Sequence, residues 1–195
     1  VNCTSEFYAA NMTVEMDDTD KLKVLLADAR QFGIEFEPPD INRGTYRFEP
    51  VDHKTVRYGL GAVKGTGSGA IEAIIAAREG TADGGGAPFR SLFDFCARVD
   101  RQRVNKRVVE ALIRCGAFDK LHPDSAGASA PPQAAGAASG GRSEGVGARA
   151  QLLASVSLAL DWADSQAAHA DQVGLFDFGD SHAASTHEPA LVSVP

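Results

Sequence analysis

Three glycines stand at alternate positions directly before a run with helical spacing, in the segment VKGTGSGAIEAIIAAR from Val63 to Arg78. A glycine-rich loop before a helix can hold phosphate, because a tight turn and the positive end of the helix bring N–H groups to one point. The phosphate could belong to a reacting nucleotide or to the backbone of DNA. The spacing of the glycines helps to decide between these two chemistries.

Nucleotide chemistry requires spacings that this loop lacks. A Walker loop needs Gly, four residues and then Gly-Lys-Ser/Thr, and no such string occurs in the chain. A dinucleotide loop needs G-x-G-x-x-G; Gly59 and Gly61 begin this pattern, but Lys64 occupies the position of the third glycine. A small nucleotide-dependent enzyme stays as an alternative, which a saturable nucleotide-binding signal would support.

The other interpretation is the hairpin of a helix-hairpin-helix unit, in which an apolar residue precedes G-x-G and a helix with an apolar face. Val63, Gly65, Gly67, Ile71, Ile74 and Ile75 fill these positions. The predicted DNA contacts here are Lys64, Gly65, Thr66, Gly67, Ser68 and Gly69. Thr66 replaces the usual apolar residue at the tip of the hairpin, and Gly69 stands where a Lys often assists the phosphate contact. We therefore expect weaker binding to DNA. A hairpin that only packs two helices is the structural alternative.

A second, degenerate unit follows between Phe89 and Phe118. Its first helix should turn Phe89, Leu92, Phe93 and Cys96 inward, and a helix from Asn105 should bury Val108, Val109, Leu112 and Ile113. Five cations at the turn are predicted to bind DNA: Arg98, Arg101, Arg103, Lys106 and Arg107. The chain has a net charge of −7, yet residues 50–122 hold twelve basic and eight acidic side chains. A solvated helix face is the alternative explanation for these cations.

No catalytic or metal-binding set is predicted. The D-x-D string Asp18-Thr19-Asp20 lies at an expected helix start, where such residues cap free N–H groups, so we interpret it as a cap. The three cysteines and five histidines lack metal-ligand spacing, and the cysteines indicate a reduced, cytoplasmic setting. No apolar run is long enough to span a membrane. We expect no cofactor.

The expected fold is mainly α, with helices over 5–15 and 19–33 and a small β-hairpin made by TYRF and TVRYG. The helix over 19–33 should turn Leu22, Leu25, Leu26, Ala29 and Phe32 inward. Residues 123–148 are rich in Ala, Gly, Ser and Pro, which predicts a disordered linker. An amphipathic helix should follow, with Leu152, Val156, Leu160, Ala163 and Ala167 on one face.

Four strings together carry a family resemblance: DINRGTYRF, VRYGLGAVKGTGSGAIEAIIAARE, SLFDFCARVD and NKRVVEALIRCGAFDKL. Over about residues 5–122 the chain resembles the alpha subunits of bacterial DNA polymerase III, the replicative C-family polymerases. The resemblance implies that residues 1–49 are the C-terminal part of the fingers and that residues 50–122 are a tandem helix-hairpin-helix module on duplex DNA. It places the metal-binding aspartates, with their Mg²⁺, upstream of this chain.

Residues 149–195 are then expected to be an amphipathic helix and a clamp-binding tail. Gln172, Leu175 and Phe176 fit the Q-x-x-L-F pattern of peptides that dock on the sliding clamp, the beta subunit. The predicted partners are double-stranded DNA, the clamp and other subunits of the polymerase III holoenzyme. The start lacks an initiator Met, so we expect a piece of a longer chain. Because the resemblance places the catalytic aspartates upstream, this segment of the polymerase is expected to be inactive alone. The alternative is a freestanding helix-hairpin-helix adaptor or repair accessory protein.

Overall fold

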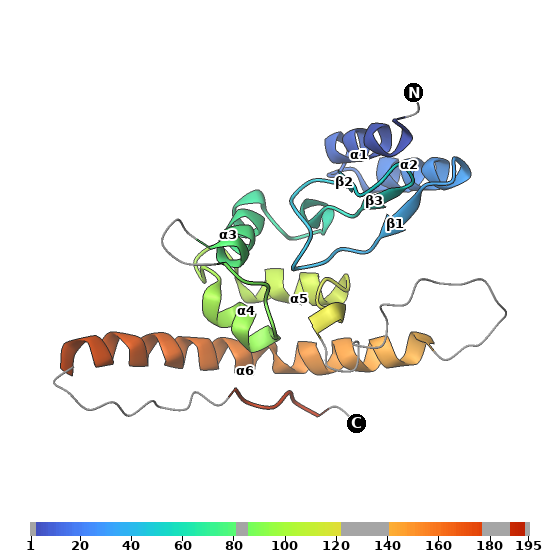
Figure 1. The fold of residues 1–195 in the computed structure, drawn as a ribbon. Helices are drawn as coiled ribbons and strands as arrows, with labels where there is room; N and C mark the ends of the chain where they lie inside the picture. The colour runs from blue at the N-terminus through green and yellow to red at the C-terminus, as the bar shows by residue number, and fades with distance from the viewer. Residues whose placement is uncertain (1–2, 81–85, 122–140, 177–187, 194–195) are drawn as a thin grey trace.

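The computed structural model describes residues 3–80, 86–121, 141–176 and 188–193, and within the last helix it describes side chains from 147 to 168. Figure 1 shows an N-terminal lobe above a group of shorter helices, with one long helix along the base. The helices are α1 (Thr4–Val14), α2 (Thr19–Gln31), α3 (Ser68–Glu79), α4 (Leu92–Arg98), α5 (Lys106–Arg114) and α6 (Gly141–Phe176), with 3₁₀ turns η1 (Leu60–Ala62) and η2 (Asp119–Leu121). The mainly helical class is confirmed.

The start of α2 explains the D-x-D string. The carboxylate of Asp18 accepts the backbone N–H groups of Asp20 and Lys21, both at 3.1 Å. These donors have no partner inside the helix, so the side chain supplies one. The string is therefore a helix cap, as predicted.

A three-stranded sheet completes the N-terminal lobe, with β1 (Glu35–Glu37), β2 (Glu49–Pro50) and β3 (Thr55–Arg57) in the order β1-β3-β2. The strands β2 and β3 are antiparallel, and β1 runs parallel to β3. The predicted hairpin is present, but the position of its first strand was wrong. That strand starts at Glu49, after the TYRF segment, and β1 was not predicted at all.

The TYRF segment, residues 45–48, pairs with a different part of the chain. The N–H of Leu60 donates to the carbonyl of Thr45 at 2.8 Å, and the N–H of Gly61 donates to that of Tyr46 at 3.0 Å. A Cβ on Gly61 would lie 2.6 Å from the ring of Tyr46. Glycine therefore permits this close approach, and the β-propensity of the segment indicated an extended backbone without indicating its partner.

The core of the N-terminal lobe joins both helices to the sheet. Its buried apolar side chains include Tyr8, Met12, Leu22, Ala29, Phe48 and Val56. The prediction that Phe32 faces inward was wrong, because its side chain is 67% exposed. Phe32 is the C-cap of α2 and lies beyond the last helical residue, so the helical spacing no longer sets its direction.

A larger core lies under the helix-hairpin-helix region. Every residue predicted to face inward in the second unit is buried: Phe89, Leu92, Phe93, Cys96, Val108, Val109, Leu112 and Ile113. Phe95 is also fully buried, although the helical pattern did not select it. Its ring meets Phe89 and Phe118 edge to face, with centroids 4.9 and 5.0 Å apart. The short helix α4 is therefore covered on more than one side.

Helix α6 belongs to this core, because it packs along α4 and α5. Of its predicted apolar face, Leu152, Val156, Leu160 and Ala163 are buried. The ring of Trp162 meets Phe93 edge to face at 5.7 Å. Ala167 is exposed, contrary to the prediction, since α6 extends past α4 and α5 (Figure 1).

The start of α6 also differs from the sequence-based boundary. The helix begins at Gly141, inside the predicted linker over 123–148, and residues 122–140 lie outside the described residues. Once the packed part of a helix exists, each added residue gains a hydrogen bond without a new nucleation cost, so a helix can extend beyond its packed face. No helix in the described part of the chain is long and apolar enough to cross a membrane.

Candidate nucleic-acid interface

The first hairpin runs from η1 to the start of α3. Gly65 has φ +96°, a left-handed conformation that side chains rarely adopt, so the turn requires glycine there. Gly67 is the N-cap of α3, and no side chain caps this helix end. Among the residues that the structure describes, a Cβ added to Gly65, Gly67 or Gly69 would meet no atom within 4 Å. The glycine-lined edge is therefore open to an incoming group.

Thr66 has a structural role inside this hairpin. The side chain is only 9% exposed, and its hydroxyl lies 2.7 Å from the carbonyl oxygen of Val63 and 2.9 Å from that of Leu60. Its backbone N–H also donates to Val63 at 3.1 Å. Thr66 thus closes the turn from within, and its side chain does not lie on the open edge where the sequence-based prediction placed it.

The open helix end has a clear electrostatic consequence. The first N–H groups of a helix have no partner within it, and the helix dipole makes this end positive. The side chain of Lys64 is exposed and makes no hydrogen bond or ion pair with any described residue. A phosphate at this edge would meet a free cation, unfilled N–H groups and no steric obstacle.

The turn between α4 and α5, residues 99–105, differs from the first hairpin because a side chain caps the helix that follows it. Asn105 caps α5 with its own side chain, which accepts the N–H of Val108 at 3.2 Å. The carboxylate of Asp100 accepts the N–H of Gln102 at 2.8 Å. The chain's own oxygens therefore occupy part of the space at this turn where an external anion would bind.

Two of the five predicted cations of the second unit contact α6. A guanidinium N–H of Arg101 donates to the carbonyl of Leu160 at 3.1 Å, and the same nitrogen lies 3.3 Å from the carboxylate of Asp164. The ammonium of Lys106 donates to the hydroxyl of Ser157 at 2.7 Å. These contacts were not predicted, because no sequence pattern indicates that α6 packs on this turn.

A third cation, Arg98, is part of the fold. Its guanidinium donates to the carbonyls of Ala77 and Ala87 at 2.6 and 2.7 Å and to the carboxylate of Asp94 at 3.2 Å. It also lies 4.8 Å from the centroid of the Phe89 ring. Arg98 links the end of α3 to α4, and both terminal nitrogens of its guanidinium already have acceptors.

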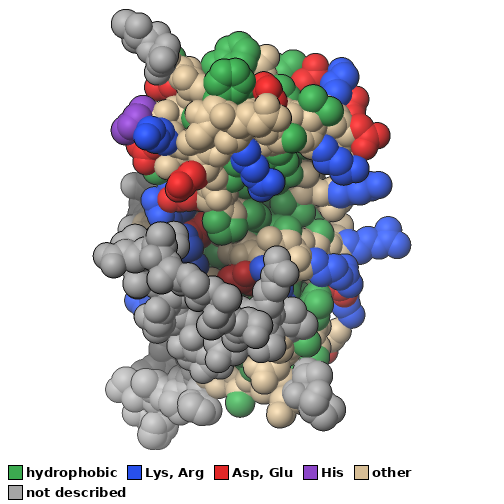
Figure 2. All heavy atoms as spheres, turned by 90° about the vertical axis from the view of Figure 1, so that its right-hand side faces the viewer, with side chains coloured by type: hydrophobic (Ala, Val, Ile, Leu, Met, Phe, Trp, Pro, Cys, Tyr) green, Lys and Arg blue, Asp and Glu red, His purple; other side chains and the backbone are tan. Residues whose placement is uncertain are grey.

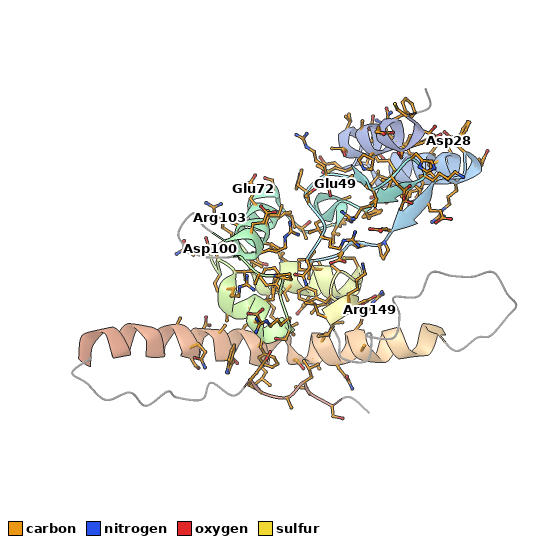
Figure 3. The ribbon with its side chains drawn as sticks, in the orientation of Figure 1. Asp28, Glu49, Glu72, Asp100, Arg103 and Arg149 are labelled. Atoms are coloured by element: carbon orange, nitrogen blue, oxygen red, sulfur yellow. The ribbon has the colours of Figure 1, made fainter. Side chains whose placement is uncertain are left out.

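The remaining two cations are exposed. Figure 3 labels Arg103 beside Asp100, with Glu72 of α3 nearby, and the Arg103 side chain lies 3.6 Å from the carboxylate of Asp100. An exposed ion pair of this kind contributes about 0–1 kcal/mol and leaves Arg103 available to another anion. Arg107 is exposed and has no hydrogen bond or ion pair within the described ranges. The accessible part of the predicted site is thus Lys64 to Gly69 without the Thr66 side chain, together with Arg103 and Arg107.

The titratable groups do not add chemistry of another kind. Burial raises the pKa of the Cys96 thiol to about 12 and raises the pKa of Cys115, so both stay protonated near neutral pH. Among the described residues there is no group of three His, Cys, Asp or Glu side chains that could hold a metal ion. The predicted clamp-binding residues Gln172, Leu175 and Phe176 lie at the end of α6, and their side chains lie outside the described residues.

Comparison with known proteins agrees with the class of protein that the two units define. Residues 33–128 match the family model described as the helix-hairpin-helix motif. This range includes the turn before β2, the open first hairpin and the whole second unit. The match therefore covers both turns described above.

The matched relatives are DNA polymerase III alpha subunits. The chain is 46% identical to that of Neisseria meningitidis serogroup B over 173 residues, which is 89% of this chain and 13% of the relative. It is 49% and 48% identical to those of Vibrio cholerae and Escherichia coli K12 over 122 residues, which is 63% of this chain and 10% of each relative. The chain is homologous to one segment of the DNA polymerase III alpha subunits and spans only about a tenth of their length.

Proposed function

We propose that this chain holds duplex DNA by its sugar-phosphate backbone, as the helix-hairpin-helix part of a replicative DNA polymerase that works in the bacterial cytoplasm. The open, uncapped and glycine-lined first hairpin carries this proposal. Its N–H groups and Lys64 suit a phosphate oxygen, and such contacts fix position without reading bases. Binding should therefore be independent of sequence and should weaken as salt rises.

Nucleotide addition belongs to another part of the longer polymerase in this proposal. Polymerase chemistry needs carboxylates that hold two metal ions about 4 Å apart, and the D-x-D string of this chain caps a helix. Mg²⁺ is then a cofactor of the parent enzyme and not of this segment. The 195-residue chain, given primer, template and Mg²⁺, should incorporate no nucleotide, and robust synthesis would overturn this assignment.

The test of DNA holding is Lys64→Glu with Lys54→Glu as its matched control. Both lysines are exposed and make no ion pair in the described part of the chain, but Lys54 lies in the N-terminal lobe, directly before β3. Lys64→Glu should weaken duplex binding and lower the slope of log K against log salt by roughly 0.9, which corresponds to one phosphate contact. Lys54→Glu should change neither value. Fluorescence anisotropy with a labelled duplex over a salt series measures both, and equal effects of the two variants would contradict the proposal.

Tethering to the sliding clamp through Gln172, Leu175 and Phe176 is the second part of the proposal. The Q-x-x-L-F pattern and its place after the helix-hairpin-helix region support it. Burial of Leu175 and Phe176 would contribute about 3–6 kcal/mol before ordering costs, so avidity with DNA would be needed for firm attachment. Replacing both with Ala should abolish capture by the beta clamp, whereas the half-exposed Leu158→Ala should not.

A freestanding helix-hairpin-helix adaptor or repair accessory protein is the competing function. This candidate also predicts DNA binding. The two candidates differ in where the open reading frame should begin. The polymerase proposal expects an open reading frame that continues for hundreds of codons upstream. An in-frame start codon with a ribosome-binding site directly before Val1 would favour the adaptor.

A further inference from the structure

A five-residue turn from Asp40 to Gly44 ties the N-terminal lobe to the helix-hairpin-helix region. Asp40 is 4% exposed, and its carboxylate accepts the ammonium of Lys120 at 2.8 Å and the N–H of Asn42 at 2.9 Å. Ile41 is fully buried, and its N–H donates to Ala117 at 2.9 Å. Both residues are fixed to the chain that follows α5.

The turn is also fixed to α3 and to the segment before α4. The amide of Asn42 donates to the carbonyl of Phe89 at 2.9 Å and accepts the N–H of Phe89 at 2.7 Å. The carbonyl of Gly44 accepts the buried guanidinium of Arg78 at 3.0 Å. A Cβ on Gly44 would lie 3.0 Å from the side chain of Leu60. Buried polar groups that are bonded on every side hold one backbone geometry.

Arg43 is the exception in this turn. Its side chain is exposed and has no hydrogen bond or ion pair with the part of the chain that the structure describes. The printed hydrogen bonds that join this turn to the helix-hairpin-helix region are made by Asp40, Ile41, Asn42 and Gly44, and none of them uses the Arg43 guanidinium. A rigid turn thus presents one free cation at a fixed place.

A second free cation starts from the same junction. Arg90 directly follows Phe89, is exposed, and has no side-chain partner among the described residues. Because Asn42 binds both backbone groups of Phe89, Arg43 and Arg90 each start one residue from this double hydrogen bond.

Two carboxylates close to the Arg90 backbone have other partners, and one of them, Asp94, accepts the backbone N–H of Arg90 at 2.9 Å. Asp94 is paired with Arg98, and Glu188 contacts the hydroxyl of Ser91. Figure 2 shows Lys and Arg side chains along one edge of the face it draws, beside an apolar recess between the upper and lower parts. Exposed cations without acidic partners are therefore a feature of this molecule beyond the first hairpin.

We infer that Arg43 and Arg90 form a second phosphate contact for the duplex, separate from the glycine hairpin. The inference rests on the proposed function, because it concerns the same duplex. The turn lies beside the hairpin, because a Cβ on Gly44 would come within 3.0 Å of the Leu60 side chain and the carbonyl of Leu60 accepts the hydroxyl of Thr66. Guanidinium groups bind phosphate oxygens in a forked geometry that suits a backbone contact. The two contacts together fix the direction of the DNA across the module.

The test uses the 195-residue chain with Arg43→Ala and Arg90→Ala combined, and a labelled duplex in a salt series. Duplex affinity should fall on the order of tenfold, and the slope of log K against log salt should fall by roughly 1.8, for two phosphates. Arg43→Lys with Arg90→Lys should restore the slope, because the charge returns. The control variant, Arg30→Ala with Lys54→Ala, removes two exposed and unpaired cations of the N-terminal lobe and should change neither value.

Each contrary result has a definite meaning. An unchanged slope for the Arg43 and Arg90 variant, while Lys64→Glu still weakens binding, would overturn this inference and leave the proposed function intact. If neither variant weakened binding, the proposed function itself would fail. The thermal midpoint should stay unchanged, and a lowered midpoint that accounts for the lost binding would assign these arginines a structural role instead.

Discussion

The turn between η1 and α3 and the turn between α4 and α5 offer different surfaces. The first hairpin is lined with glycine and ends at an uncapped helix, and Lys64 has no side-chain partner in the described ranges. The second turn holds most of the positive charge, yet Asn105 caps its helix and α6 covers part of it. Charge density along the sequence therefore does not measure how much charge a partner can reach.

The difference has a simple physical cause. Binding to a phosphate backbone gains free energy when a cation displaces condensed counterions from the nucleic acid. Arg101 already faces Asp164 and the carbonyl of Leu160, and Lys106 already donates to Ser157. A phosphate must compete with these partners, whereas at Lys64 it competes only with water.

The largest effect should come from the core that the two units share. Phe95→Ala removes the ring that contacts Phe89 and Phe118 and leaves a cavity in a fully buried site. The free energy of unfolding should fall by about 3–5 kcal/mol. Thermal unfolding followed by circular dichroism should show one transition at a lower temperature. Two separate transitions would mean that the two units fold independently, as separate domains, and do not share one core.

A smaller effect, on duplex affinity, should show directly that the two turns differ. Gly65→Val places a β-branched side chain at φ +96° and should cost about 1–3 kcal/mol of local strain. The open edge should distort, and duplex affinity should fall at least tenfold in anisotropy measurements, by roughly 1.4 kcal/mol or more.

Two variants serve as controls for Gly65→Val. Gly69→Ala lies in α3 at a negative φ with open space around it, so it should keep or slightly raise stability. Gln102→Val introduces the same side chain in the second turn, where the residue is exposed, and should leave duplex binding unchanged. Equal losses of binding for Gly65→Val and Gln102→Val would remove the distinction between the turns.

Local patterns in the sequence predicted the elements and most of the core. Helical spacing found Ile71, Leu112 and their neighbours because each helix buries one continuous face, and the Asp18 cap follows from its own next three residues. Phe32 and the start of α6 are errors of local helix boundaries, whereas the other failures concern long-range partners. Nothing near Thr45 indicates that it pairs with Leu60, and nothing near Arg101 indicates a helix that lies sixty residues later. The functional site was predicted less well than the core, because the exposure of a cation depends on such long-range partners.

The smallest predicted effect would sharpen the comparison by opening the second turn. Asp164→Asn with Ser157→Ala removes the carboxylate paired with Arg101 and the hydroxyl that accepts Lys106, both at exposed positions of α6, and leaves Arg101 only the carbonyl of Leu160. The two cations should then become available to phosphate. Duplex affinity should rise a few-fold, and the salt slope should increase by up to roughly 1.8.

The reciprocal variant, Arg101→Ala with Lys106→Ala, is the control for this release. In a chain with intact α6 contacts it should weaken duplex binding less than Lys64→Glu, because these cations are already engaged. In the released background the same substitutions should remove the gained affinity. If they weakened binding equally in both backgrounds, α6 would not compete with DNA, and the second turn would be as open as the first.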